Sequence, residues 1–282
     1  MDDAVRYLGA NVDADTALAL LQWQAEMGAD EAILDEPLDR FDIAERTPAP
    51  VAAEQLPNPA APPTSERPAA TASPDHAALL SEAHALAGRA TTLAELAALQ
   101  EGFDGIDLKK GARRFCFADG RPDARVMVLG EAPDDDDDVQ GRPFAGPPGA
   151  MLDRMFAAIG LSRDAVDAER ALYLANILPW RAPTGRDPAP EAIELSLPFL
   201  RRHVELAQPE VIVLFGNLAC AAALGRQGIL RMRGQWAEAF GRPALPMVHP
   251  AYLLKTPIAK REAWADLLSL SARLDEMAAG RS

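Results

Sequence analysis

Four short, almost continuously apolar runs, separated by longer helix-like segments, limit what this chain can fold into. The runs span residues 125–130 (RVMVLG), 171–178 (ALYLANIL), 210–215 (EVIVLF) and 244–248 (ALPMV). Helix-like patterns span residues 76–100, 149–159, 190–206, 217–224 and 259–277. Strands without polar alternation are typical of a parallel sheet that helices cover on both faces. The sequence therefore predicts an α/β fold, a three-layer α/β/α sandwich around a four-stranded parallel sheet.

The first quarter of the chain has a different composition from the rest. Residues 1–46 are acidic and contain one amphipathic pattern at 16–27, which predicts a helical segment too short to hold a core by itself. Residues 47–74 hold eight prolines and eight alanines in 28 residues. Such a composition predicts a disordered linker, because few of its side chains can offset the ordering entropy. The functional domain is then expected at 75–282.

Charge and cysteine content exclude several classes of protein. The net charge of −14, taken alone, argues against a nucleic-acid binder. Residues 1–100 carry 17 acids and 5 bases, however, and residues 101–282 carry 25 acids and 23 bases, so the acidity belongs to the N-terminal region. No apolar run reaches the ~18–20 residues of a membrane span, and the first residues lack the features of a secretory signal. Two cysteines, Cys116 and Cys220, cannot alone ligate a structural zinc or an iron–sulfur cluster. We therefore expect a cytoplasmic protein without disulfides.

Parallel α/β folds place their sites at the carboxyl ends of strands, and three such places here carry unusual residues. GEAP follows the first run, and a rigid glycine- and proline-rich turn then presents Phe144. The second run contains Asn176, whose amide offers the donor and acceptor pair that suits a nucleobase edge. The fourth run is followed by His249, whose direction Pro250 restricts. These three residues are the candidate site.

Each signal also has an ordinary structural interpretation. Phe144 would fill the core, Asn176 would bond neighbouring backbone, and His249 would be a structural histidine. The run Asp134–Asp138 is interpreted as a solvated acidic loop, because carboxylates in a metal site must converge rather than sit in a row. No Gly-Lys-Ser/Thr follows the first run, which excludes a nucleotide-binding P-loop.

The order and spacing of these motifs resemble the uracil-DNA glycosylase superfamily, and its type-4 branch most of all. The motifs are GEAP…GRPFAGPPGAMLDRM, YLANILPWR, VIVLFG and HPAYLLK, within roughly residues 99–277. The resemblance implies an enzyme of base excision repair that hydrolyses the N-glycosidic bond of deoxyuridine in DNA. The target nucleotide would be flipped out of the duplex, since the reacting carbon is unreachable within the stack.

The resemblance also implies roles at the base. Phe144 would stack on uracil, and Asn176 would bond its O4 and N3–H edge. His249 would donate to O2, where negative charge builds as the bond breaks. Glu131 and Asp137 match two acids that position or activate water and stabilise the cationic sugar, and the sequence does not choose between them.

Further residues match positions that contact DNA in relatives. Leu253 falls where relatives insert a wedge into the gap left by the flipped base. Arg142, Lys255 and Arg181 would meet phosphates. The partner is therefore uracil-containing DNA. We also expect a monomer without a membrane association.

The chain departs from the type-4 pattern at the positions of the metal ligands. Type-4 enzymes carry a 4Fe–4S cluster on four cysteines, and the matching positions here are all apolar: Phe103, Ile106, Trp180 and Leu195. Four bulky apolar residues indicate a cluster site refilled as core. The sequence predicts no cluster and no other cofactor.

A second departure motivates alternatives. Asp134 stands where the family usually has glycine, and its charge would lie near the DNA backbone. The chain is then either an active glycosylase or a catalytically silent member that binds DNA or a repair partner. A glycosylase for another deaminated base is a third reading. No Arg-rich, His-containing insertion lies between Trp180 and Asp187, so ordinary turnover is expected rather than a covalent adduct. The acidic segment 1–46 is a candidate tether for a repair-protein partner.

Overall fold

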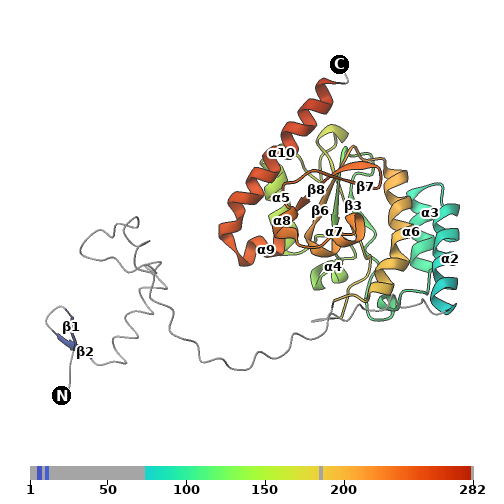
Figure 1. Cartoon of the computed structure of the whole chain (residues 1–282), viewed down its shortest axis with the longest axis horizontal. Helices are drawn as coiled ribbons and strands as arrows, with labels where there is room; N and C mark the ends of the chain where they lie inside the picture. The colour runs from blue at the N-terminus through green and yellow to red at the C-terminus, as the bar shows by residue number, and fades with distance from the viewer. Residues whose placement is uncertain (1–4, 8–9, 13–73, 184–186, 281–282) are drawn as a thin grey trace, which may run out of the picture. The chain divides into compact units, whose positions relative to one another are not determined.

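The computed structural model describes residues 5–7, 10–12, 74–183 and 187–280 (Figure 1). The chain divides into two compact units, Met1–Pro68 and Ala69–Ser282. In the first unit, β1 (Val5–Tyr7) and β2 (Ala10–Val12) form an antiparallel pair. The predicted helix at 16–27 lies outside the described residues, as does the predicted linker except for its last residue, with which α2 begins.

The second unit is built on a six-stranded sheet in the order β3-β5-β4-β6-β8-β7. The strands are β3 (Ala118–Gly120), β4 (Val126–Gly130), β5 (Leu172–Asn176), β6 (Val211–Phe215), β7 (Ala237–Ala239) and β8 (Arg242–Met247). The four predicted runs form the central strands, which pair in parallel. The expected four-stranded sheet is extended by β3 and β7, which add antiparallel edges. Their sequences, ADG and AEA, carry no apolar run that would predict a strand.

Helices precede, connect and follow the strands of the sheet. They are α2 (Pro74–Arg89), α3 (Leu93–Gly102), α4 (Asp135–Gln140), α5 (Pro147–Ala157), α6 (Pro190–Ala207), α7 (Gly216–Leu224), α8 (Ile229–Met232), α9 (Pro250–Lys255) and α10 (Lys260–Ala279), with 3₁₀ turns at η2 (Asp107–Lys110), η3 (Ala168–Arg170) and η4 (Pro257–Ala259). The single helix expected over 76–100 is two, because Thr92 caps α3 by accepting a hydrogen bond from the Glu95 N–H. Within the described ranges, no helix combines the length and apolar character of a membrane span.

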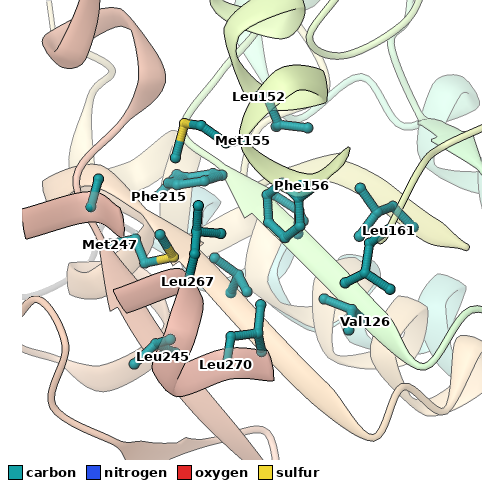
Figure 2. Packing of buried hydrophobic residues seen from close by; sticks show 14 of the residues in the cluster. Val126, Leu152, Met155, Phe156, Leu161, Phe215, Leu245, Met247, Leu267 and Leu270 are labelled. Atoms are coloured by element: carbon teal, nitrogen blue, oxygen red, sulfur yellow. The ribbon is translucent and has the colours of Figure 1, made fainter. Parts of the chain in front are cut away.

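Helices cover both faces of the sheet. α5, α9 and α10 pack on one face and α6 and α7 on the other, while α2 and α3 lie against α6 (Figure 1). Figure 2 shows the first face, where Phe156 of α5 and Leu267 of α10 meet Val126, Phe215 and Leu245 of the strands. We call this face the α5–α10 face.

Candidate active site

Alternation along the strands directs the predicted base-binding residues to the α5–α10 face. Side chains two residues apart on a strand share a face. Leu174 packs into the α5–α10 core, so Asn176 at the end of β5 points the same way. Met247 does the same on β8 and places His249 on this side, and Phe215 ends β6 there too. Because these strands are parallel, their carboxyl ends bring the three side chains to one edge of the sheet.

Three aromatic rings meet at this edge. The Phe144 and His249 ring centroids are 5.8 Å apart with their planes 22° from parallel. Phe215 meets both edge-on, at 6.3 Å from Phe144 and 6.1 Å from His249. Phe144 is buried in the α5–α10 core, as its structural interpretation expected, yet it also lies beside His249. The two interpretations are therefore compatible.

The turn that carries Phe144 is held in an unusual backbone conformation. Phe144 has a φ of 54°, in the left-handed region that costs free energy for a residue with a side chain. The Asp137 carboxylate accepts a hydrogen bond from the Ala145 N–H at 2.6 Å, and Arg163 donates to the Pro143 carbonyl at 3.3 Å. These contacts, one on each side of Phe144, hold the backbone of the turn from which the ring projects.

Asn176 has an unsatisfied amide. The side chain is 7% exposed, and its Nδ2 has no hydrogen-bond partner among the described residues. A buried donor without a partner costs about 1–3 kcal/mol, so native proteins rarely keep one without a reason. The carbonyl end of the amide and the Phe144 ring both crowd Gly130, where a Cβ would overlap Asn176 Oδ1 and Phe144 Cζ. A free donor thus lies close to an aromatic ring, an arrangement suited to a planar polar ligand.

His249 is held as a neutral imidazole that can donate a hydrogen bond. It is the N-cap of α9, and its Nδ1 accepts a hydrogen bond from the Ala251 N–H at 3.2 Å. A neutral ring that accepts at Nδ1 carries its proton on Nε2. Burial lowers the pKa of His249 to about 4, although the charge of Asp134 acts in the opposite direction. At neutral pH the ring therefore offers Nε2–H without carrying a positive charge.

Glu131 follows β4 at the same carboxyl end of the sheet, and its carboxylate lies beside Gly216, where β6 ends and α7 begins. Its Oε1 accepts a hydrogen bond from the Leu218 N–H at 2.8 Å, at the start of α7. Burial raises the pKa of Glu131, and the hydrogen bonds from the α7 backbone partly counter that rise. The residue borders a cavity of about 650 Å³ that Asn217, Gln227 and Asp187 also line. Its carboxylate is therefore near space that water can occupy.

Asp137 is bound to backbone instead. It is the third residue of α4, and Asp134 and Asp137 form a capping box in which Asp134 Oδ1 accepts from the Asp137 N–H at 2.9 Å. Burial, and then the charge of Asp134, raise the pKa of Asp137 to about 6, although the hydrogen bond from Ala145 acts in the opposite direction. Asp137 thus joins α4 to the Phe144 turn, and Asp134 uses its exposed side chain to begin the helix.

The aspartate run is not the solvated loop that the sequence indicated. It forms α4, and Asp138 is only 2% exposed. The Asp138 carboxylate accepts from the N–H groups of Arg113 at 2.7 Å and Arg114 at 3.1 Å. It also pairs with Arg181 Nε at 3.3 Å, while Arg181 Nη1 lies 3.1 Å from Asp135. An aspartate N-cap with a second aspartate three residues later was the signal for this helix.

The same contacts change the expectation for Arg181. Its guanidinium is held by two carboxylates of α4, which leaves it poorly placed to meet a phosphate. Arg142 is about half exposed and pairs with Asp119 at 3.3 Å. Lys255 is exposed at the end of α9 and has no ion pair within the described part of the chain. Arg142 and Lys255 are therefore the better placed of the three for DNA.

The expectation for Leu253 does not fit the structure. Its side chain is 0% exposed and packs beneath α9 against α5 and α10, so it has no free surface to insert into DNA. Its neighbours Tyr252 and Leu254 are 38% and 40% exposed. Adjacent residues of a helix point about 100° apart, so burying Leu253 turns these two outward.

The four positions that match the cluster cysteines come together in one apolar core. Phe103, Ile106, Trp180 and Leu195 are each 1–3% exposed and pack in the cluster beneath α2, α3 and α6. Phe103 contacts Phe199 at 5.5 Å between ring centroids. None of these side chains offers iron a ligand. Across the described residues, no three His, Cys, Asp or Glu side chains converge as metal ligands. The residues present do not fit a 4Fe–4S cluster.

Two further residues support the site, although neither is among the site residues predicted from the sequence. Phe215 completes the ring cluster, and the two-residue period of its strand was the signal for it. Arg163 is buried and bonds Asp153 at 2.8 Å and Asp119 at 2.9 Å besides Pro143. Its segment has no motif that would single it out, because its partners are brought together only by the fold.

Changing Asp137 to asparagine is expected to remove a pH dependence of stability. A folded-state pKa of about 6, above the ordinary 3.8, means that the folded state binds this proton more tightly. The resulting stabilisation is full below about pH 4 and is lost as pH rises through about 6, an effect on the order of 1–3 kcal/mol. Urea unfolding at several pH values should show the wild type losing stability relative to Asp137→Asn over this range. If the stabilities of the wild type and Asp137→Asn change with pH in parallel, the raised pKa of Asp137 is contradicted.

Comparisons with known proteins agree with this geometry. The family model described as the Uracil DNA glycosylase superfamily matches residues 117–268. A type-4 uracil-DNA glycosylase of Archaeoglobus fulgidus is 34% identical over 169 residues, covering 57% of this chain and 82% of that protein. Type-4 enzymes of Thermotoga maritima and Pyrobaculum aerophilum are 31% and 28% identical, covering 70% and 91% of their own lengths. The matched region contains the parallel strands, the Phe144 turn, Asn176 and His249, and the chain therefore belongs to the uracil-DNA glycosylase superfamily.

Proposed function

We propose that this chain is a uracil-DNA glycosylase, which hydrolyses the N-glycosidic bond of deoxyuridine in DNA. The observation that carries the proposal is the buried, unpartnered Nδ2 of Asn176 beside the Phe144 ring. Its type-4 relatives are named for the same activity. The flipped nucleotide would place its base against Phe144, between the amide and His249.

Asn176 would select uracil by its hydrogen-bonding edge. Its Nδ2 would donate to O4 and its Oδ1 would accept from N3–H, which satisfies the orphaned donor. Cytosine presents a donor and an acceptor in the reverse order, so the same amide meets it donor to donor. Each mismatched buried polar contact costs about 1–3 kcal/mol. β5 is buried along its length, which holds the backbone of Asn176 in place.

His249 would stabilise the departing base. As the glycosidic bond lengthens, its electron pair moves into the uracil ring and negative charge develops on O2. A neutral imidazole with its proton on Nε2 donates a hydrogen bond to this oxygen, as an oxyanion-hole donor does. Because the His249 pKa is near 4, the ring keeps this form throughout the neutral range.

Glu131 is the better candidate for the acid that activates water. Its carboxylate borders a cavity, and its raised pKa suits a group that takes a proton from water. Asp137 instead has its oxygens bound by backbone N–H groups, with Ala145 at 2.6 Å and Asp134 at 3.4 Å. We assign Asp137 the role of positioning the Phe144 turn.

Helix α9 would meet the DNA. Tyr252 and Leu254 are its exposed apolar side chains and take the wedge role expected of Leu253. Lys255 follows them and would contact a phosphate, as would Arg142, two residues before Phe144. We call the residues that would hold the base, Phe144, Asn176 and His249, the base pocket.

The proposed enzyme works without an iron–sulfur cluster. The support is the apolar core formed by Phe103, Ile106, Trp180 and Leu195, which closes the position where relatives would ligate iron. The purified chain is expected to lack the absorbance near ~400 nm that accompanies such clusters. Iron analysis of protein expressed with excess iron and sulfide checks this. Stoichiometric iron that is lost together with activity on chelation would contradict it.

The proposal includes a cellular setting. Cys116 and Cys220 are both free and buried, which suits a reducing compartment such as the cytoplasm. A monomer acting on DNA, with the acidic segment 1–46 as a tether for a repair protein, completes the proposal.

The direct test is release of free uracil from a labelled oligonucleotide, single- and double-stranded, at low salt with EDTA present. Release from deoxyuridine and not from deoxycytidine or thymidine is expected. A folded protein that binds DNA but releases no base would instead favour a silent family member. Release of another deaminated base in place of uracil would point to a different substrate.

A further inference from the structure

We infer that the turn carrying Arg113 and Arg114 is a second contact for the DNA backbone, next to the base pocket. The inference rests on the proposed action on DNA, but it concerns a surface that none of the site motifs includes. This surface, which we call the 113–114 turn, also contains the half-buried ring of Phe115.

The 113–114 turn lies at the same end of the sheet as the site. The Cys116 N–H, just after the turn, donates to the Pro179 carbonyl at 2.9 Å, and Pro179 follows the carboxyl end of β5. The Asp138 carboxylate, on the helix that follows the carboxyl end of β4, accepts from both backbone N–H groups of the turn. The turn is thus held by the segments that follow the two strands at the centre of the site.

The two arginine side chains are available to a ligand. Both are exposed, and neither has an ion-pair or hydrogen-bond partner for its guanidinium within the described ranges. The nearby cations are different: Arg181 is held by two carboxylates, and Lys109 by Asp104 at 2.6 Å. The two adjacent arginines thus place two accessible positive charges on the active end of the sheet, beside the acidic helix α4.

A hollow gives this surface the shape to hold a strand. A cavity of about 480 Å³ is bordered by Arg113, Arg114, Lys109 and Phe115, with Glu101 as the one acidic side chain. Phe115 packs against Trp180 with ring centroids 5.1 Å apart, which fixes one wall. Cationic side chains beside an aromatic ring are the chemistry by which proteins hold a nucleic-acid strand. The ligand is therefore a phosphodiester of the substrate strand.

One short helix joins this surface to the base pocket. Asp137 of α4 bonds the Phe144 turn, and its neighbour Asp138 bonds the 113–114 turn. The two turns are therefore fixed at a constant separation, and phosphate binding at one would position the strand whose uracil enters the other.

The test is the salt dependence of DNA binding by the full chain, measured by fluorescence anisotropy on DNA without uracil. The double variant Arg113→Gln/Arg114→Gln should have a shallower slope of log K against log salt. On duplex DNA the magnitude of the negative slope should decrease by about 1.8, since each lost phosphate contact removes about 0.9. The uracil-release assay should show a higher KM with kcat retained at saturating DNA. Arg113→Lys/Arg114→Lys should keep the wild-type slope, because it keeps the charges.

The matched control is Arg89→Gln/Arg170→Gln, which removes two exposed charges elsewhere: Arg89 ends α2, and Arg170 precedes the amino end of β5. An unchanged slope in the control and a reduced slope at the 113–114 turn support the inference. The inference is overturned if the Gln variant of the turn and the Gln control have equal slopes. It is also overturned if the Lys variant of the turn loses as much slope as the Gln variant. Binding to uracil-free DNA needs no catalysis, so a failure to release uracil would count against the proposed function alone.

Discussion

Replacing Asn176 with alanine is expected to lower the rate of uracil release by about 10²–10³-fold, the loss typical of removing one preorganised hydrogen-bond donor. Nδ2 has no hydrogen-bond partner among the described residues, so its removal breaks no hydrogen bond that the structure shows there. A buried donor that pays for its desolvation without a bond also costs stability. The variant should therefore be far less active and yet no less stable, apart from the small cavity left by the side chain.

The measurement is single-turnover uracil release with enzyme in excess, beside thermal unfolding of the same preparation. Tyr173→Phe is the matched control, since it deletes one polar atom from the same strand on the opposite face. Its hydroxyl bonds His203 at 2.7 Å, so this change should lower stability and leave the rate of release almost unchanged. A rate for Asn176→Ala within a few-fold of wild type would mean that the amide does not bind the base.

The sequence was sufficient for the residues whose position follows from a strand. Asn176 and His249 end apolar runs, and the two-residue period of a parallel strand determines which face they take. Phe144 was predictable as a presented ring because glycine and proline restrict the turn around it. These predictions needed only local periodicity and the rule that parallel strands end at one edge.

The sequence did not predict features that depend on how a helix is rotated about its axis or on contacts between distant segments. In the helix that follows His249, three consecutive apolar residues lie on different sides, and only the packing of α9 on α5 shows that Leu253 is the buried one. The contacts of Asp138 with the 113–114 turn join segments about 25 residues apart. No local pattern encodes such a contact, so the burial of Asp138 could not be predicted, although the spacing of Asp134 and Asp137 was a signal for the helix itself.

Replacing Gly130 with alanine is expected to lower uracil release by about 10²-fold through displacement alone, since a misplacement of about 1 Å in a site costs on the order of 10² in rate. The added methyl group would overlap Asn176 Oδ1 and Phe144 Cζ together, so neither side chain can keep its place. Gly130 does not have a positive φ, so alanine suits its backbone, and the cost to folding is the ~1–3 kcal/mol of overpacking.

The change at Gly130 separates base recognition from DNA binding. Its methyl group affects the amide and the ring but neither Lys255 nor the 113–114 turn, so the affinity for uracil-free DNA should equal that of the wild type while release falls. Gly88→Ala is the control, because its methyl group meets no atom within 4 Å in α2 and should raise stability by about 0.5–1 kcal/mol. Wild-type release by Gly130→Ala would show that the ring and the amide need not lie this close for the base to bind. An equal loss of DNA affinity and release would show that the base pocket and the DNA-binding surface are not separate.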